Sequence, residues 1–293
     1  MAVFIIGTGR CGTTMLAQML NSHSMICVPD ELQILFEYSN NGARLFEIFN
    51  DKKNEYFGPE DYIRLIEATC PHNLQAYFNY RIFFEKQNYP IHGLSELASS
   101  LFSEIAASKH KSIFVEQTPW YGQRIDVLNQ LFSDAKYIHM VRDGRDVAIS
   151  FARTPWWHDD IGANLERWHA EVRQIIDSSN RILNPGQILQ VRYEDLVEQP
   201  ENGLRRICGF LGVDFEEAML NPATYIDYSL YSKINEGNIS SLALNEWSNR
   251  KVVPTFKGSR YAWKNHQGFD FSSMPKPIAE SLKALGYDDS SCV

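Results

Sequence analysis

A glycine-rich loop near the start of the chain constrains the fold more than any other feature of the sequence. An apolar run, Val3–Ile6, leads into a loop that contains Gly7, Gly9 and Gly12. A helical pattern begins at about Thr13. A strand, a glycine loop and a helix N-terminus together hold an anion, because the backbone N–H groups of the loop converge on it and the helix dipole adds partial positive charge. The sequence therefore predicts an α/β fold whose first loop binds a phosphate-like group.

The position of the cation separates this loop from the GxxxxGK[ST] loop of nucleotide triphosphatases. Gly7, Gly12 and Thr14 match that pattern. Thr13 stands in the place of the lysine, and the cation lies upstream at Arg10. Triphosphatases use the lysine with Mg²⁺ to hold the β- and γ-phosphates. The loop therefore predicts an anion site that differs in chemistry from a triphosphate site.

Apolar strand patterns and helical patterns alternate along the rest of the chain, which predicts a mostly parallel sheet flanked by helices in a three-layer α/β fold. The strand patterns cover residues 3–6, 25–28, 112–115, 136–141 and 187–191. The helical patterns cover residues 13–21, 42–49, 59–69, 94–108, 122–132, 147–153, 161–183 and 203–220. We expect one domain over 1–293, with the polar segment 221–259 as a cap over the active site.

Composition excludes several classes of function. The 293 residues carry a net charge of −8, which argues against nucleic-acid binding, and 44% are hydrophobic, enough to bury a substantial core. Five cysteines without a CxxC pair indicate reduced thiols. No signal-peptide pattern is present, and no run approaches the roughly 18 apolar residues of a membrane span. We therefore expect a cytoplasmic protein, either a monomer or a homodimer.

Three separated segments resemble the sulfotransferases that use 3′-phosphoadenosine 5′-phosphosulfate (PAPS). GTGRCGTT at 7–14 resembles their 5′-phosphosulfate loop. VRDGRDVAIS at 141–150 resembles their 3′-phosphate motif, with Arg142 and Ser150 eight residues apart. KGSRYAWKNH at 257–266 resembles the late K-G-x-x-x-x-W-K-N-H element of the cytosolic members. The resemblance implies the P-loop-like sulfotransferase fold and PAPS as the donor. The sequence has no Asp/His cluster at metal-ligand spacing, so we expect no metal.

The resemblance also implies a set of donor-binding residues, which are Gly9, Arg10, Cys11, Gly12, Thr13, Thr14, Arg142, Ser150, Tyr193, Lys257 and Gly258. Chemistry agrees for Arg142, because a guanidinium at a strand end can hold a phosphate through two parallel hydrogen bonds. Tyr193 matches a tyrosine that the family places near the adenine or the 3′-phosphate, although a core aromatic at a strand end is an equal alternative. The family's R-K-G triplet reads Phe256-Lys257-Gly258, so one cation is absent and Arg260 is the candidate to replace it.

Two carboxylates are candidates for the general base that takes the proton of the acceptor. Cytosolic sulfotransferases use a histidine in a T-H-L-P context, but the matching stretch here, 115–119, contains Gln117 and no histidine. In the tyrosylprotein sulfotransferases, the second Glu of a later G-E-E pattern is the base, and it falls on Glu31. We predict Glu31 as the base, Glu116 as the runner-up or an orienting partner, and Arg10 as the group that stabilises the departing phosphate. A carboxylate that merely pairs with a basic side chain is the alternative for each.

The segment Thr154-Pro-Trp-Trp-His-Asp-Asp160 is the candidate for acceptor binding. Trp156, Trp157 and His158, with Gln117, would line the pocket; tryptophans that fill a helix–sheet interface are the alternative. We predict a small-molecule acceptor with a hydroxyl or amine, as in natural-product biosynthesis. The acidic segments disfavour a sulfated glycan. Sulfation of a protein tyrosine or a glycan, a kinase or nucleotide hydrolase, and a non-catalytic binding module stay open as alternatives.

Overall fold

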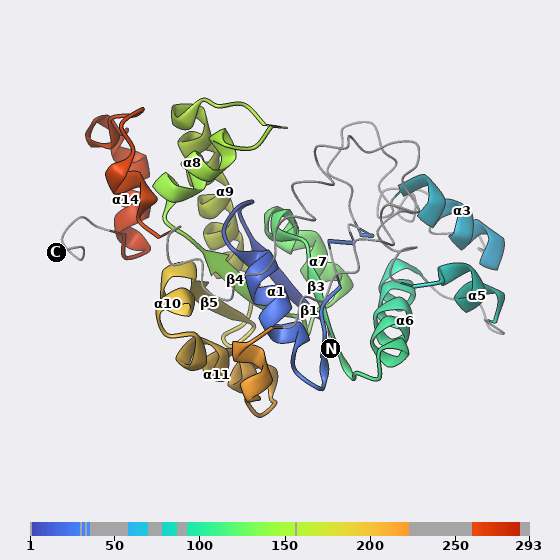
Figure 1. The fold of residues 1–293 in the computed structure, drawn as a ribbon. Helices are drawn as coiled ribbons and strands as arrows, with labels where there is room; N and C mark the ends of the chain where they lie inside the picture. Colours follow the sequence, from blue (N-terminus) through green and yellow to red (C-terminus); the bar gives the residue numbers. More distant parts are fainter. Residues whose placement is uncertain are drawn as a thin grey trace. The chain divides into compact units, whose positions relative to one another are not determined.

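The computed structural model describes residues 2–29, 31–32, 34–35, 58–69, 78–86, 93–155, 157–222 and 260–287. The five strands form one parallel sheet in the order β2-β3-β1-β4-β5, flanked by helices (Figure 1). They are β1 (Val3–Gly7), β2 (Ile26–Cys27), β3 (Ile113–Gln117), β4 (Lys136–Val141) and β5 (Ile188–Arg192). The predicted α/β class with a parallel sheet is confirmed.

The helices follow the sequence patterns closely in most places. The α-helices are α1 (Thr13–Asn21), α3 (Pro59–Thr69), α5 (Tyr80–Glu85), α6 (Gly93–Ser108), α7 (Ile125–Leu131), α8 (Gly144–Ala152), α9 (Ile161–Ile182), α10 (Tyr193–Glu198), α11 (Pro200–Leu211) and α14 (Lys276–Ala284). Short 3₁₀ turns are η1 (Pro119–Arg124), η2 (Glu217–Leu220), η4 (Ala262–Asn265) and η5 (Phe271–Ser273). No described helix is long and apolar enough to cross a membrane. The helix expected over 42–49 and most of the expected cap, 223–259, lie outside the described residues.

One predicted helix, 203–220, is wrong in its extent. Helix α11 ends at Leu211, because Gly212 adopts a left-handed conformation with φ +81° and its N–H donates to the Cys208 carbonyl at 2.8 Å. This is a common way to end a helix, since glycine enters the left-handed region without steric cost. The remaining residues of the pattern form only the short turn η2.

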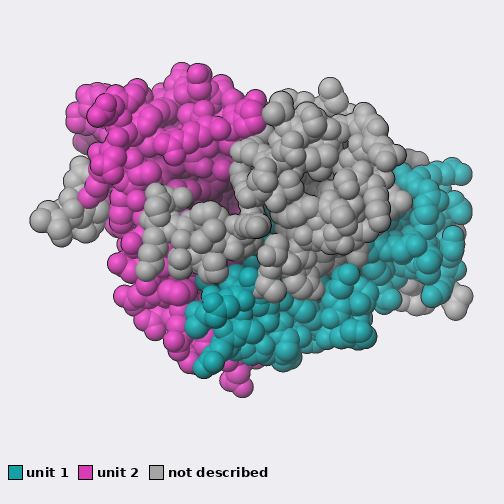
Figure 2. All heavy atoms as spheres, in the orientation of Figure 1, with its two compact units in different colours: residues 1–3, 17–118, 216–253 teal, residues 4–16, 119–215, 254–293 magenta. Residues whose placement is uncertain are grey.

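Contacts divide the chain into two compact units, each built from segments that are distant in sequence (Figure 2). Unit 1 comprises residues 1–3, 17–118 and 216–253, and unit 2 comprises residues 4–16, 119–215 and 254–293. In unit 1, α6 packs on β2 and β3, and the Phe102 and Phe114 rings stack with centroids 4.4 Å apart. The expectation of one domain over 1–293 stays a prediction.

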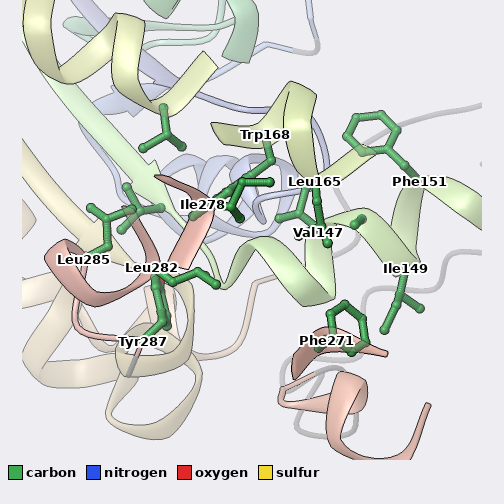
Figure 3. Packing of buried hydrophobic residues seen from close by; sticks show 13 residues of the cluster. Val147, Ile149, Phe151, Leu165, Trp168, Phe271, Ile278, Leu282, Leu285 and Tyr287 are labelled. Carbon is green, nitrogen blue, oxygen red and sulfur yellow. The ribbon is translucent and has the colours of Figure 1, made fainter. Parts of the chain in front are cut away.

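The core of unit 2 lies where α8 and α9 pack together and where the C-terminal segment joins them (Figure 3). Its members are Val141, Val147, Ala148, Ile149, Phe151, Leu165, Trp168, Val172, Phe271, Ile278, Leu282, Leu285 and Tyr287. Trp168 is only 1% exposed and lies against the start of α8, where a Cβ on Gly144 would sit 2.4 Å from the indole. The glycine of the segment Arg142-Asp143-Gly144 therefore lets α9 approach the start of α8.

Gly144→Ala is expected to destabilise the protein by about 1–3 kcal/mol, because the new methyl group overlaps a large, fixed, buried ring. Gly209→Ala is the matched control: Gly209 lies in α11 and nothing lies within 4 Å of the position of its Cβ. Alanine there is expected to leave stability unchanged or raise it by up to about 1 kcal/mol through helix propensity. Urea denaturation measures both variants, and equal stability of the two would contradict this account of Gly144.

Candidate active site

The glycine loop between β1 and α1 is so closely packed that its three glycines are sterically required. A Cβ on Gly7 would lie 2.5 Å from the Met140 carbonyl oxygen. A Cβ on Gly12 would lie 2.5 Å from the ring of Tyr193, and Gly12 has φ +96°. A Cβ on Gly9 would lie 2.6 Å from the ring of Phe151. Arg10 also adopts a left-handed conformation, with φ +64°. These constraints fix the path of the loop before any ligand binds.

Arg10 makes contacts with both ends of the Arg142–Ser150 segment. Its Nε donates to Ser150 Oγ at 3.0 Å, and its backbone carbonyl accepts a hydrogen bond from Arg142 Nη1 at 2.9 Å. These contacts join positions that are 140 and 132 residues apart in sequence. The structure therefore brings together the predicted groups for both anions of the donor, with two guanidinium groups in one cluster.

Tyr193 links this cluster to the loop. The guanidinium carbon of Arg142 lies 4.6 Å from the centroid of the Tyr193 ring, and the same ring packs against Gly12. Both side chains are buried. The cation–π contact adds about 0.5–2 kcal/mol and limits the positions that Arg142 can take. Tyr193 thus combines the two roles that the sequence left open, a core aromatic and a neighbour of the predicted phosphate site.

The third family segment packs against the second. Asp146 Oδ1 accepts a hydrogen bond from the backbone N–H of Trp263 at 3.0 Å, and the guanidinium carbon of Arg145 lies 3.5 Å from the Trp263 ring centroid. Burial raises the pKa of Asp146 to about 6, although the charge of Arg142 opposes the shift. Lys257 and Gly258 lie outside the described residues, whereas Arg260 forms an ion pair with Glu198 at 3.3 Å.

The remaining loop residues differ in exposure. Cys11 is fully buried, and this burial raises the pKa of its thiol to about 12, so it is a packing residue and not a reactive thiolate. Thr13 is buried at the start of α1, whereas Thr14 is exposed. An exposed hydroxyl in the first turn of a helix can donate to an anion bound there.

The two candidate carboxylates, Glu31 and Glu116, belong to unit 1. Glu116 lies in β3 and is completely buried, and its Oε1 accepts a hydrogen bond from Thr118 Oγ1 at 2.7 Å. Burial raises its pKa to about 8, the Thr118 hydroxyl opposes this, and the charge of Glu31 adds to it. Glu31 follows β2 and is half-buried. A carboxyl that is mostly protonated at neutral pH is a poor base, and the assignment of Glu31 as the base stays a prediction.

The raised pKa of Glu116 has a consequence for stability. The folded state holds this proton up to about pH 8, while the unfolded chain releases it near the ordinary value of 4.5. Glu116 therefore destabilises the folded state progressively as pH rises from about 4.5 to 8, by at most about 1.4 kcal/mol per pH unit. We expect the free energy of unfolding, measured by urea denaturation, to fall less for Glu116→Gln than for the wild type as the pH rises from 5 to 8. Parallel curves for the two proteins would contradict the assignment.

Two of the predicted acceptor residues, Trp157 and His158, lie together, with their ring centroids 5.3 Å apart. Trp157 Nε1 donates to Asn164 Oδ1 at 2.8 Å, and the Trp157 ring packs on the core of unit 2. The guanidinium of Arg167 lies 4.4 Å from the centroid of this ring. His158 is exposed, Gln117 is buried at the end of β3, and Trp156 lies outside the described residues. The alternative of an interface-filling tryptophan therefore describes the position of Trp157.

Sequence reasoning missed several buried groups around Arg142. Among them are Arg145 and Glu194, which are the second arginine of the segment 142–146 and the residue after Tyr193. In the sequence, the available signal was a charged residue beside an aromatic one, as with Glu194 after Tyr193. The sequence does not reveal the distant residues that these charged groups contact. No group of three or more metal-ligating side chains occurs within the described parts of the chain.

The fold and the site define an α/β protein with a glycine loop after its first strand and a buried arginine beside that loop. A model of the sulfotransferase family matches residues 2–217, and the chain belongs to this family of PAPS-dependent enzymes. This assignment decides against a kinase, a nucleotide hydrolase or a non-catalytic module.

Similar proteins cover almost the whole chain. Protein-tyrosine sulfotransferase A of Caenorhabditis elegans is 23% identical over 293 residues, which is 98% of this chain and 67% of the relative. The sulfotransferase domain of the olefin synthase from Synechococcus PCC 7002 is 27% identical, with a TM-score of 0.64 over 98% of this chain and 94% of that domain. The sulfotransferase domain of the curacin biosynthetic pathway shares the fold, with 22% identity, a TM-score of 0.63 and 98% of each chain covered.

Proposed function

We propose that this enzyme transfers the sulfuryl group of PAPS to a hydroxyl or amine of a small molecule, with Glu31 as general base and without a metal. The observation that supports PAPS as the donor is the cluster in which Arg10 is hydrogen-bonded to both Arg142 and Ser150. Two cations beside a glycine loop suit a donor with two separate anionic groups. In the proposal the protein is cytoplasmic and a monomer or homodimer.

The residues present fit PAPS. Position 12 has no room for a side chain beside the Tyr193 ring. Glycine at this position therefore leaves only backbone at the start of α1, where an anion would bind. The N–H groups of residues 9–14 and the Thr14 hydroxyl would hold the 5′-phosphosulfate. Arg142 and Ser150 would hold the 3′-phosphate, with Tyr193 beside them. Lys257 and Gly258 are assigned to the same phosphate by the family resemblance alone.

Arg10 is proposed to stabilise the charge that develops on the departing phosphate. In the reaction, the acceptor oxygen or nitrogen forms a bond to sulfur while the bond from sulfur to the bridging phosphate oxygen breaks. Glu31 takes the proton of the acceptor, and Arg10 donates to the oxygen that leaves. Ser150 and Arg142 hold Arg10 before the reaction, and such preorganised donors are most effective for transition-state charge. Glu116, mostly protonated, is assigned an orienting role.

Two observations support a small acceptor. The olefin synthase domain, from a biosynthetic protein, is similar over 98% of this chain, and the net charge of −8 disfavours a heavily anionic glycan. The assignment to natural-product biosynthesis rests on the first of these. A protein tyrosine is the second candidate, because the Caenorhabditis elegans protein-tyrosine sulfotransferase is also similar over nearly the whole chain.

Transfer of radiolabel from sulfur-labelled PAPS to a panel of acceptors tests this choice. The panel contains small hydroxylated and amine compounds, a tyrosine peptide and a desulfated glycan. We expect labelled product from small alcohols or amines. Label that appears only in the peptide or the glycan would overturn the small-molecule acceptor and leave the donor site intact.

A further inference from the structure

A buried polar network includes the residues that directly follow Arg142 and Tyr193 in the sequence. Its centre is Glu194, the residue after Tyr193. Glu194 Oε1 accepts a hydrogen bond from the backbone N–H of Asp143 at 3.1 Å, and its Oε2 accepts one from the Tyr287 hydroxyl at 2.8 Å. The three residues are all nearly inaccessible to solvent. One carboxylate therefore joins the end of β4, the start of α10 and the C-terminal segment.

The position of Glu194 connects the two residues that stack at the site. Asp143 directly follows Arg142, and Glu194 directly follows Tyr193. The bond from Asp143 N–H to Glu194 therefore fixes the backbone of Arg142 relative to that of Tyr193, whose ring lies 4.6 Å from the Arg142 guanidinium. A buried hydrogen bond to a carboxylate has a more restricted geometry and a greater strength than a neutral one.

Tyr287 is itself held by several groups after the end of α14. Arg145 Nη2 donates to the Tyr287 carbonyl at 3.0 Å and also forms a buried salt bridge with Asp143 at 2.8 Å. Arg192 donates to the Gly286 carbonyl at 3.2 Å, and its guanidinium lies 4.4 Å from the Tyr287 ring centroid. Burial, with the neighbouring charge of Glu194, raises the pKa of Tyr287 well above its ordinary value, so the hydroxyl stays a donor.

We propose that Glu194 and Tyr287 are positioning residues that hold Arg142 and Tyr193 in the geometry that recognises the 3′-phosphate of the donor. This proposal rests on the proposed role of Arg142. The C-terminal segment is thereby part of the recognition of the nucleotide, although it does not contact the donor in this account. Its contribution is selective: it favours a nucleotide with a 3′-phosphate over one without it.

The test compares two nucleotides by calorimetry on the full chain: 3′-phosphoadenosine 5′-phosphate (PAP) and adenosine 5′-monophosphate (AMP), which lacks the 3′-phosphate. The ratio of their dissociation constants measures recognition of that phosphate. We expect Tyr287→Phe to reduce the preference for PAP by about 3- to 10-fold, the range for the net loss of one ordinary hydrogen bond, with AMP affinity changed by less than about 2-fold. Glu194→Gln is expected to act in the same direction.

Tyr137→Phe is the matched control. Tyr137 is a buried tyrosine of β4 whose hydroxyl has no hydrogen-bond partner among the described residues. The Tyr137→Phe protein is expected to have the same ratio of dissociation constants for PAP and AMP as the wild type. All variants are measured well below their melting temperatures. If Tyr287→Phe does not fold, the ratio of PAP and AMP dissociation constants of Glu194→Gln tests the proposal instead.

Three outcomes would overturn either the positioning role of Tyr287 and Glu194 or the proposed role of Arg142. A Tyr287→Phe protein that melts earlier but keeps the wild-type preference for PAP shows a merely structural tyrosine and overturns the positioning role. An equal loss of affinity for PAP and AMP overturns it too. If Arg142→Ala keeps the wild-type preference, the proposed role of Arg142 fails first, and the positioning proposal falls with it.

Discussion

Arg10→Ala is expected to reduce the kcat of sulfuryl transfer by about 10²- to 10³-fold, the usual loss when a preorganised donor to transition-state charge is removed. Arg10 is the loop cation, and Ser150 Oγ at 3.0 Å fixes its side chain. The backbone cost is unchanged, because neither arginine nor alanine favours the φ of +64°. Initial rates with radiolabelled PAPS, together with PAP affinity by calorimetry, measure the effect.

Two further variants control for charge and for surface effects. Arg10→Lys keeps the positive charge but lacks the planar donor pair, so we expect partial recovery of the rate. Arg205→Ala removes an exposed arginine of α11 that pairs with Glu201 in the same helix and lies 4.3 Å from the centroid of the Phe215 ring, and the rate of this variant is expected to match the wild type. An Arg10→Ala enzyme that keeps more than about a tenth of the wild-type rate would contradict the role of Arg10.

Glu31→Gln is expected to lower kcat by about 10²- to 10⁴-fold while PAP affinity stays unchanged, because an amide cannot accept the proton of the acceptor. The measurement is the same rate assay with saturating PAPS, performed on Glu31→Gln and Glu116→Gln in parallel. Since Glu116 is mostly protonated at neutral pH, its amide variant is expected to lose much less activity. A fully active Glu31→Gln enzyme would remove Glu31 as the base, and a larger loss in Glu116→Gln would reverse the two roles.

The strands and most helices were predictable from the sequence because their signals are local. The run Tyr137–Val141 is apolar throughout apart from one histidine, as expected for a strand buried on both faces. Helix α11 was predicted too long, because its apolar spacing continues past Gly212 while the left-handed glycine ends the helix. Periodicity reports which face is buried and gives little information on where a helix stops.

The site was predictable where a motif carries its own chemistry. Arg10 and Arg142 stand in segments whose residue types already indicate an anion, and the structure joins them through the Arg10 carbonyl. Contacts between distant positions were not predictable. The bond between Glu194 and Tyr287 spans 93 residues, and no local pattern marks either partner. The two tryptophans were ambiguous for a similar reason, since an aromatic residue suits a pocket and a core equally well.

The most direct test of the two-anion donor site is a crystal structure of the protein with PAP bound. We predict that the 5′-phosphate lies against the N–H groups of residues 9–14 and Arg10, and that the 3′-phosphate lies within hydrogen-bond distance of Arg142 and Ser150. A 3′-phosphate that lies away from both Arg142 and Ser150, or a nucleotide bound elsewhere than on the glycine loop, would contradict it.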